Sequence, residues 1–260
     1  MGLNGAYTNT LVNIRSSVAG PYVKIGYAAA DWGAFPGDIQ EVVWFKDSLS
    51  NADLEKVETY LSLKYGTTLA HDYVNAAGTT VYSLTTNAGY VSNIAGIARE
   101  DVNGNLYQKQ SNSVNVGEKL VIGLTGLANT NDANTSTLNN GDFLIWGNNG
   151  LAYTFSEPLT GMGTPNMRLA AIWKAQNTGI GTVRVAWPTT NSSLYLLQSS
   201  SDAFTSGTTT LMSSIISING VDYKYADVTL ANGQYFTLGE RNLTPGGVPA
   251  AAWYRADESS

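Results

Sequence analysis

The fold class follows from two neighbouring apolar segments, RLAAIWKA at residues 168–175 and GTVRVA at residues 181–186. Short apolar runs of this kind, bounded by turn-forming residues, are typical of β-strands. Similar segments occur between residues 75 and 239, at residues 80–84, 94–99, 119–124, 142–147, 194–198, 215–218, 223–228 and 235–239. The sequences between them are rich in Asn, Gly, Asp and Ser, which favour tight turns. This series of short strands predicts an all-β fold, an antiparallel β-sandwich, rather than a βαβ fold.

One short helix is predicted at about residues 50–65, ahead of the strand series. Ser50 is a suitable N-cap, and Asp53 stands where a carboxylate can reach back to an orphan amide. Gly66 supplies the left-handed residue that ends a helix. Apolar residues recur between these ends at helical spacing, at Leu54, Val57, Leu61 and Tyr65. The helix is therefore expected to pack one apolar stripe on a sheet.

Two further strands are predicted before the helix, at residues 22–27 and 37–45. The second, GDIQEVVWF, is apolar enough to be expected buried on both faces. Trp44 in this strand, and Trp146 and Trp173 in later strands, are expected to belong to the hydrophobic core. Trp32 and Phe35 lie in a loop with Gly and Pro, and they are the better candidates for an exposed, ligand-binding contact with a sugar.

Composition indicates an extracellular or cell-surface protein. Charged residues make up only 13% of the chain, about half of the share that soluble domains usually carry. The net charge of −6 and the lack of any basic run argue against a nucleic-acid partner, because phosphates favour clustered Lys and Arg. No stretch approaches the roughly 18 apolar residues that span a bilayer. The absence of cysteine excludes disulfides and thiolate metal sites.

Residues 37–66 resemble the closing part of a concanavalin-A-like, laminin-G-type jelly roll from secreted bacterial proteins. The resemblance rests on GDIQEV at residues 37–42, Leu49 with Ser50, and VETYLSLKYG at residues 57–66. The sequence that follows, up to about residue 240, resembles an uncharacterised β-domain that follows this module in multidomain surface proteins of Bacteroidota-type bacteria. That likeness rests on IAGIARED (94–101), QKQS (108–111), FLIWG (143–147), RLAAIWK (168–174) and YFTLG (235–239). Together these segments imply a jelly-roll-like β-sandwich.

The resemblance implies three parts: residues 1–74 as the end of a jelly roll, residues 75–241 as a β-sandwich domain, and residues 242–260 as a linker and the first strand of a following jelly roll. WYRAD at residues 253–257 resembles such an opening strand. A jelly roll divided in this way suggests strand addition, which completes the incomplete sheet of a neighbouring copy. The donor residues would be Ala252, Trp253, Tyr254, Arg255 and Ala256. Head-to-tail contacts of this kind propagate into a filament, whereas an arbitrary cut through a longer chain explains the same pattern without assembly.

One segment resembles a cation site. Asp101, Asn103 and Asn105 carry oxygen-bearing side chains at alternate positions, as calcium loops do. The later bidentate Glu of an EF-hand is missing, and Asn and Asp before Gly are also what a plain turn requires. Both interpretations stay open, and calcium is the one cofactor that the sequence suggests.

No catalytic residue is assigned. Asp38 and Glu41 flank the predicted strand at residues 37–45, but their spacing puts them on opposite faces, unlike the carboxylate pair of a glycosidase. Turn capping and a solvated strand edge are therefore their expected roles. The single histidine, His71, is expected to be a solvent-exposed linker residue after the helix. No serine stands in a nucleophile-elbow context.

The sequence therefore favours a non-catalytic structural or adhesive module of a secreted or cell-surface bacterial protein. Its expected partners are copies of itself or adjacent domains of the same protein. The alternative is a carbohydrate-binding module with a glycan partner, which would require a concave face bearing exposed aromatic and polar side chains. An enzyme would require carboxylates that converge in a cleft.

Overall fold

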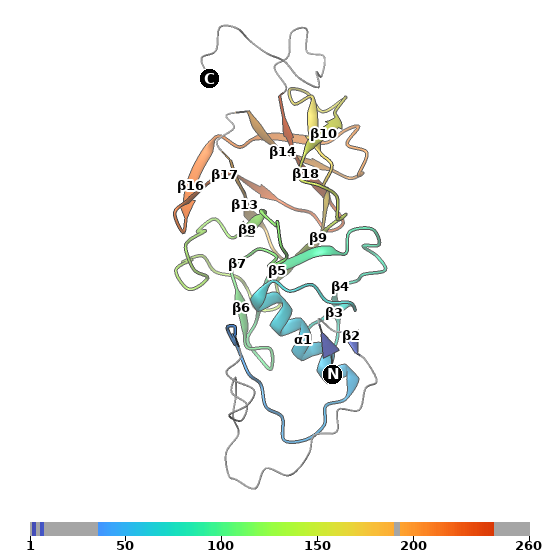
Figure 1. Cartoon of the computed structure of the whole chain (residues 1–260), viewed down its shortest axis with the longest axis vertical. Coiled ribbons are helices and arrows are strands. Elements are labelled where there is room, and N and C mark those ends of the chain that lie inside the picture. The colour runs from blue at the N-terminus through green and yellow to red at the C-terminus, as the bar shows by residue number, and fades with distance from the viewer. Residues whose placement is uncertain (1, 4–5, 8–35, 190–192, 242–260) are drawn as a thin grey trace.

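The computed structural model describes residues 2–3, 6–7, 36–189 and 193–241 (Figure 1). These residues form one helix, α1 (Asn51–Tyr65), and strands that pair antiparallel throughout. The strands are β1 (Gly2–Leu3), β2 (Ala6–Tyr7), β3 (Tyr73–Val74), β4 (Thr80–Tyr82), β5 (Ser92–Glu100), β6 (Leu106–Gln108), β7 (Gln110–Ser111), β8 (Val121–Gly123), β9 (Phe143–Asn148), β10 (Phe155–Pro158), β11 (Met167–Leu169), β12 (Trp173–Thr178), β13 (Thr182–Pro188), β14 (Leu194–Ser199), β15 (Thr208–Leu211), β16 (Ser214–Ile218), β17 (Val221–Thr229) and β18 (Tyr235–Glu240). The predicted all-β, antiparallel class with one short helix is confirmed.

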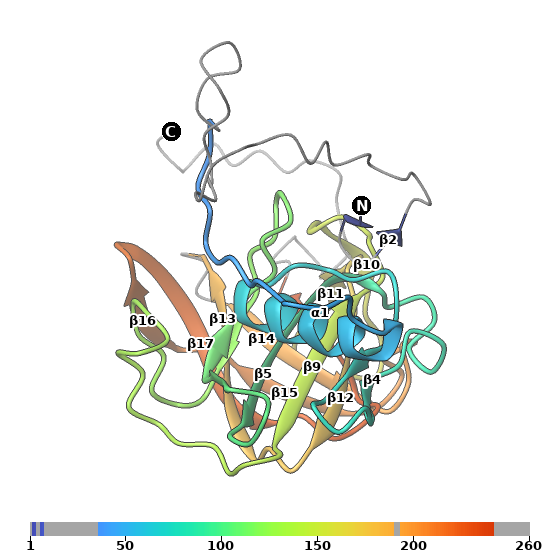
Figure 2. The same cartoon turned by 90° about the horizontal axis from the view of Figure 1, so that it is seen from below.

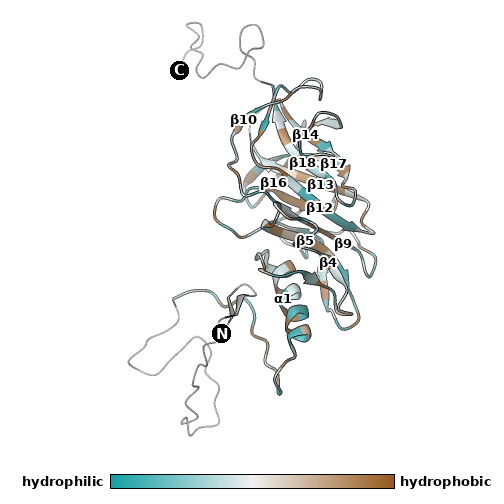
Figure 3. Cartoon of the chain, turned by 90° about the vertical axis from the view of Figure 1, so that its right-hand side faces the viewer, coloured by the Kyte–Doolittle hydropathy of each residue, from teal (hydrophilic) through white to brown (hydrophobic). Residues whose placement is uncertain are grey.

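Two sheets make up the sandwich. The larger has nine strands in the order β10-β11-β18-β12-β9-β5-β6, and β14 with β15 continues it from β18. The smaller has five strands in the order β16-β17-β13-β8-β7. Their facing side chains form one hydrophobic core, in which Trp146, Trp173 and Phe236 meet Ile122 and Val185. The hydrophobic residues concentrate on these strands (Figure 3).

The helix and the β3–β4 hairpin form a third layer beneath the larger sheet, where α1 contacts β5 and β6 (Figure 2). Successive side chains of a strand point to opposite faces. In β9, Leu144 and Trp146 therefore face the five-stranded sheet, while Phe143 and Ile145 pack with Leu63 of the helix. This central strand is buried on both faces because a layer covers each of them.

The ends of the helix are those predicted from the sequence. Ser50 is the N-cap, and its side chain accepts a hydrogen bond from the Asp53 amide at 3.1 Å. The Asp53 carboxylate accepts the Ser50 hydroxyl at 2.7 Å, rather than reaching a backbone amide. Gly66 ends the helix with φ of 68°. The fully buried face, however, consists of Thr59, Ser62 and Leu63, and the predicted stripe is only half-buried.

All strands predicted between residues 75 and 239 are present, with one difference. The segment at residues 168–175 is divided into β11 and β12, which both pair with β18. The amides of Ala170 and Ala171 between them bond to the carbonyls of Thr154 and Ala152 instead. These bonds turn the chain away from the ladder, so one predicted strand becomes two.

The prediction of a buried strand at residues 37–45 is wrong. The segment has no regular secondary structure, and no backbone hydrogen bond joins it to any other described residue. Trp44, expected in the core, is 76% exposed, whereas Trp146 and Trp173 are buried as predicted. An apolar run is buried only where other elements cover it, and among the described residues only α1 and its neighbours border this segment on one side. The strand predicted at residues 22–27 lies outside the described residues.

Candidate functional site

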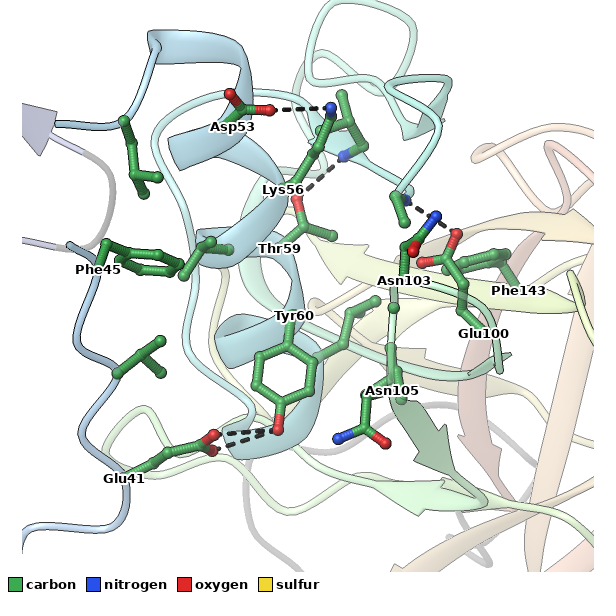
Figure 4. A pocket seen from close by; sticks show the side chains of 18 residues that line it. Glu41, Phe45, Asp53, Lys56, Thr59, Tyr60, Glu100, Asn103, Asn105 and Phe143 are labelled. Atoms are coloured by element: carbon green, nitrogen blue, oxygen red, sulfur yellow. Dashed lines mark hydrogen bonds and ion pairs between the residues drawn. The ribbon is translucent and has the colours of Figure 1, made fainter. Parts of the chain in front are cut away.

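A pocket of about 610 Å³ lies beside α1, between residues 41–49 and the turn that joins β5 to β6 (Figure 4). Its wall is apolar at Val43, Phe45, Leu63 and Phe143. Three carboxylates and one lysine also line it, namely Glu41, Asp53, Glu100 and Lys56. An apolar cavity with a few polar groups is the usual form of a binding site.

The helix fixes one wall of the pocket through contacts with the β3 strand. Thr59 lies on the buried face of α1, and its hydroxyl accepts a hydrogen bond from the Val74 amide at 3.0 Å. Asp53 and Lys56 form an ion pair of 3.1 Å at the start of the helix. The hydrogen bond from Ser50 and then that from Lys56 hold the pKa of Asp53 below its ordinary value. These polar groups therefore already have partners within the protein.

Glu41 anchors the segment at residues 41–49 to the helix. Its carboxylate accepts hydrogen bonds from the Lys64 ammonium at 2.9 Å and from the hydroxyls of Tyr65 at 2.8 Å and Tyr60 at 3.1 Å. Lys64 also donates to the Tyr60 hydroxyl at 2.6 Å. The hydrogen bonds from Lys64 and Tyr65 lower the pKa of Glu41, and those that Lys64 donates to Tyr60 and Glu41 raise the pKa of Lys64. The Glu41 carboxylate is thus fixed by three hydrogen-bond donors of α1. It is not the solvated strand-edge residue that the sequence predicts.

The segment presents two different faces because it is extended. Glu41, Val43 and Phe45 line the pocket, while the alternate residues do not. Val42 and Trp44 instead expose 51% and 76% of their surface. The apolar side chains of Val42 and Trp44 therefore point away from the described part of the protein.

The predicted calcium residues lie at the turn between β5 and β6, where their roles diverge. Asn103 and Asn105 line the pocket and adopt positive φ of 64° and 46°, as residues of tight turns do. Asp101 does not line it, because its carboxylate pairs with Arg99 at 2.8 Å and its amide binds Asn140. The turn thus brings together only two of the three predicted ligands.

Glu100 is a pocket residue that the sequence analysis missed. Its carboxylate accepts a hydrogen bond from the Ala76 amide at 2.9 Å, and burial raises its pKa. Together with Asn103 and Asn105 it lines the pocket beside the β5–β6 turn. No group of three or more His, Cys, Asp and Glu residues that could hold a metal ion occurs in the described parts of the chain. Calcium binding stays a prediction.

His71 is not the solvent-exposed linker residue that was expected. Its Nε2 lies 2.8 Å from the Glu58 carboxylate of α1, and its Nδ1 lies 2.8 Å from the Asp72 carbonyl. The His71 side chain is only 19% exposed. The Nε2 contact therefore ties the chain after the helix back to the helix, whereas the Nδ1 contact is local. Trp32, Phe35 and the predicted donor residues 252–256 lie outside the described residues.

Comparison with known families gives one match. A family model described as "Domain of unknown function (DUF8202)" matches residues 53–234. The chain belongs to this family. Searches among curated proteins and among solved structures found no match. The DUF8202 match covers most of α1 and every strand of the two sheets except β18, and it excludes the exposed segment at residues 36–49. The helix of the DUF8202 domain, the only one among the described residues, is not long and apolar enough to cross a membrane.

Two of the three carboxylates that line the pocket already have side-chain partners within the protein. Glu41 is occupied by the Lys64, Tyr60 and Tyr65 side chains, and Asp53 by Ser50 and Lys56. The signal for this arrangement was present in the sequence, because Tyr60 and Lys64 stand four residues apart on one helix face. What the sequence could not indicate was their partner, Glu41, which lies on a segment predicted as a buried strand.

Proposed function

We propose that this chain is a non-catalytic structural module of a secreted or cell-surface bacterial protein that joins neighbouring copies by strand addition at residues 37–45. The observation that carries the proposal is the exposed apolar face of this segment, formed by Val42 and Trp44. The low charged fraction of 13% supports the extracellular setting. Hydrogen bonds that occupy Glu41 and His71 support a structural role for these side chains.

The backbone of this segment supports the same proposal. Residues 37–45 make no backbone hydrogen bond to any other residue in the described ranges. An extended segment with free amides and carbonyls is a template for another strand. Strand addition satisfies these groups and gives specificity through alternate side chains. Glu41 holds the segment on the helix, so that the acceptor is positioned before a partner arrives.

The proposed donor is the segment AAAWYRAD at residues 250–257 of a second copy. Its apolar residues and its resemblance to the opening strand of a jelly roll support this assignment. The donor and the acceptor lie at different positions of the chain, so the contact is heterologous. Repetition of a heterologous contact that does not close into a ring produces a filament.

The test is the oligomeric state of the purified chain, measured by light scattering and by negative-stain electron microscopy. We expect the whole chain to form filaments or long oligomers. A chain that ends at Leu243 and the variant Trp44→Ser are both expected to be monomeric, because each removes one side of the contact. Val116→Ser is the matched control, since Val116 is fully exposed and lies outside the acceptor segment.

Two outcomes would contradict the proposal. A chain ending at Leu243 that still polymerises would exclude residues 250–257 as the donor. A whole chain that stays monomeric up to the highest soluble concentration would exclude assembly altogether.

A further inference from the structure

A second hollow, of about 750 Å³, lies against the outer face of the five-stranded sheet. It is bounded by the end of α1 at Tyr65, by the strands β6 and β7, and by the loop at residues 129–131. The β16–β17 hairpin closes its far side. Apart from Gln40, Lys64 and Tyr65, its lining is distinct from the residues that hold the 36–49 segment.

The floor of this groove is apolar and aromatic. Val121 and Ile218 contribute to it from β8 and β16, and Tyr223 contributes from β17. These side chains belong to a cluster on the outer sheet face that also contains Tyr225. Tyr223 is half-buried, and burial raises its pKa. Within the described residues its hydroxyl has no hydrogen-bond partner, so this group is available to a ligand.

The rim carries amide side chains that are fixed by the hydrogen bonds they donate, but whose side-chain oxygens accept none from the described residues. Asn219 donates its backbone and side-chain N–H groups to Asn129, at 2.8 Å and 3.3 Å. Gln108 donates from Nε2 to the Gln110 carbonyl at 2.7 Å. The side-chain oxygens of Asn219 and Gln108 accept no hydrogen bond from the described residues. Such fixed, partly free amides can bind hydroxyl groups without first losing conformational freedom.

The groove also contains an ammonium group, that of Lys119, with no carboxylate partner among the described residues. The neighbouring Glu118 does not neutralise it, because one Glu118 oxygen accepts the Tyr153 hydroxyl and the other accepts the backbone amides of Lys119 and Leu120. The Lys119 Nζ lies 6.0 Å from the centre of the Trp187 ring. No carboxylate of the described residues therefore competes with an electronegative group of a ligand for this ammonium.

We propose that this groove binds a polysaccharide chain, with one sugar ring stacked on Tyr223 and its hydroxyls bonded to Gln108, Asn219 and Lys119. A sugar ring has an apolar C–H face and a rim of hydroxyls, which matches an aromatic floor beside free amides. A peptide anchor would instead need a deep apolar pocket. The net charge of −6 disfavours nucleic acid. This proposal is independent of strand addition at residues 37–45.

Affinity electrophoresis of the whole chain tests the polysaccharide proposal. Each native gel contains one soluble polysaccharide. The panel holds neutral chains (β-glucan, xylan and mannan) and uronate chains (alginate and polygalacturonate). We expect retardation by at least one of them. Tyr223→Ser should weaken that retardation about tenfold, the upper range for loss of an aromatic contact. Tyr195→Ser is the matched control, because Tyr195 is also half-buried but lies on β14 in the other sheet.

Two further variants keep the test decisive if Tyr223→Ser fails to fold. Tyr223→Phe keeps the ring and should retain most of the retardation. Lys119→Gln, at an exposed position, should weaken binding of a uronate chain more than binding of a neutral one. This difference distinguishes a uronate polysaccharide from a neutral polysaccharide as the ligand. Unchanged migration in every gel, or full retardation of a folded Tyr223→Ser variant, would overturn the proposal. If the chain is monomeric but binds a polysaccharide, strand addition is refuted and the polysaccharide proposal is not.

Discussion

Two apolar runs of similar composition, EVVWF at residues 41–45 and FLIWG at residues 143–147, lie in opposite environments. The tryptophan of the first, Trp44, is 76% exposed, while that of the second, Trp146, is 1% exposed. Both runs have the hydropathy of a buried strand. Hydropathy therefore identifies a segment that gains from burial, but it does not identify what covers the segment.

The neighbours of each run explain the difference. The second run, in β9, pairs with β5 on one side and β12 on the other, and layers cover both of its faces. The first run is attached to α1 mainly by the side chain of Glu41. Its backbone has no partner strand within the described residues. A strand is thus defined by its pairing, and the first run pairs with no strand of the described residues.

The sharpest test of this comparison is a pair of tryptophan substitutions. Trp146→Ala is expected to lower the free energy of unfolding by about 3–5 kcal/mol, because it opens a cavity between the two sheets. Trp44→Ala should change it by less than about 0.5 kcal/mol, since an exposed side chain loses little on truncation. Urea denaturation of monomeric protein, followed by circular dichroism, measures both.

Trp44→Ala has a second use in the same experiment. If it were as costly as Trp146→Ala, residues 41–45 would be packed in the monomer, and the proposed acceptor surface would not exist. If it is neutral in the monomer but prevents oligomers, the exposed tryptophan acts only in assembly.

Most of the fold could be predicted from the sequence because its elements are defined locally. Ser50 and Gly66 mark the ends of the helix through short-range hydrogen bonds, and turn residues separate the strands. The order of strands in the sheets could not be predicted, because it depends on contacts between distant segments. The division of residues 168–175 into β11 and β12 has the same origin, since residues 152–154 supply the carbonyls that bend the chain.

The site was less predictable because its residues act through tertiary contacts. Glu41 was assigned to a solvated edge, yet three side chains of α1 bind it. The sequence predicts a solvent-exposed His71, yet its Nε2 contacts Glu58 in the middle of α1. Asn103 and Asn105 do line a pocket, but the carboxylate beside them is that of Glu100, not Asp101. Sequence spacing identified the turn and could not identify which side chains face inward.

The close contact between α1 and β5 sharpens the contrast with the loosely attached segment. A Cβ added at Gly96 would lie 2.8 Å from both the Leu63 Cδ2 and the Ile145 Cγ1. Gly96→Ala is therefore expected to cost about 1–3 kcal/mol of unfolding free energy through overpacking. Gly181→Ala is the control, because a Cβ there would meet nothing within 4 Å. Equal effects of both substitutions in urea denaturation would show that the helix can shift away from the sheet.

A smaller effect than that of Gly96→Ala is expected at Glu41, which joins the two regions being compared. Glu41→Gln keeps the shape of the side chain but removes its charge, so that Lys64 loses its ionic partner. Because both side chains are partly exposed, the loss should be at most about 1 kcal/mol at pH 7. Glu55→Gln is the control, since Glu55 lies on the same helix and makes no hydrogen bond or ion pair with the described residues.

The effect of Glu41→Gln should also depend on pH. The hydrogen bonds from Lys64 and Tyr65 hold the pKa of Glu41 in the folded protein below its ordinary value of 4.5. A carboxylate with a lowered pKa stabilises the folded state above its ordinary pKa, and this contribution is lost as pH falls through the lowered value. The difference between wild type and Glu41→Gln should therefore be constant from pH 7 to about pH 5 and shrink toward acid. A difference that grew on acidification would mean that the Glu41 charge is not what holds the exposed segment on the helix.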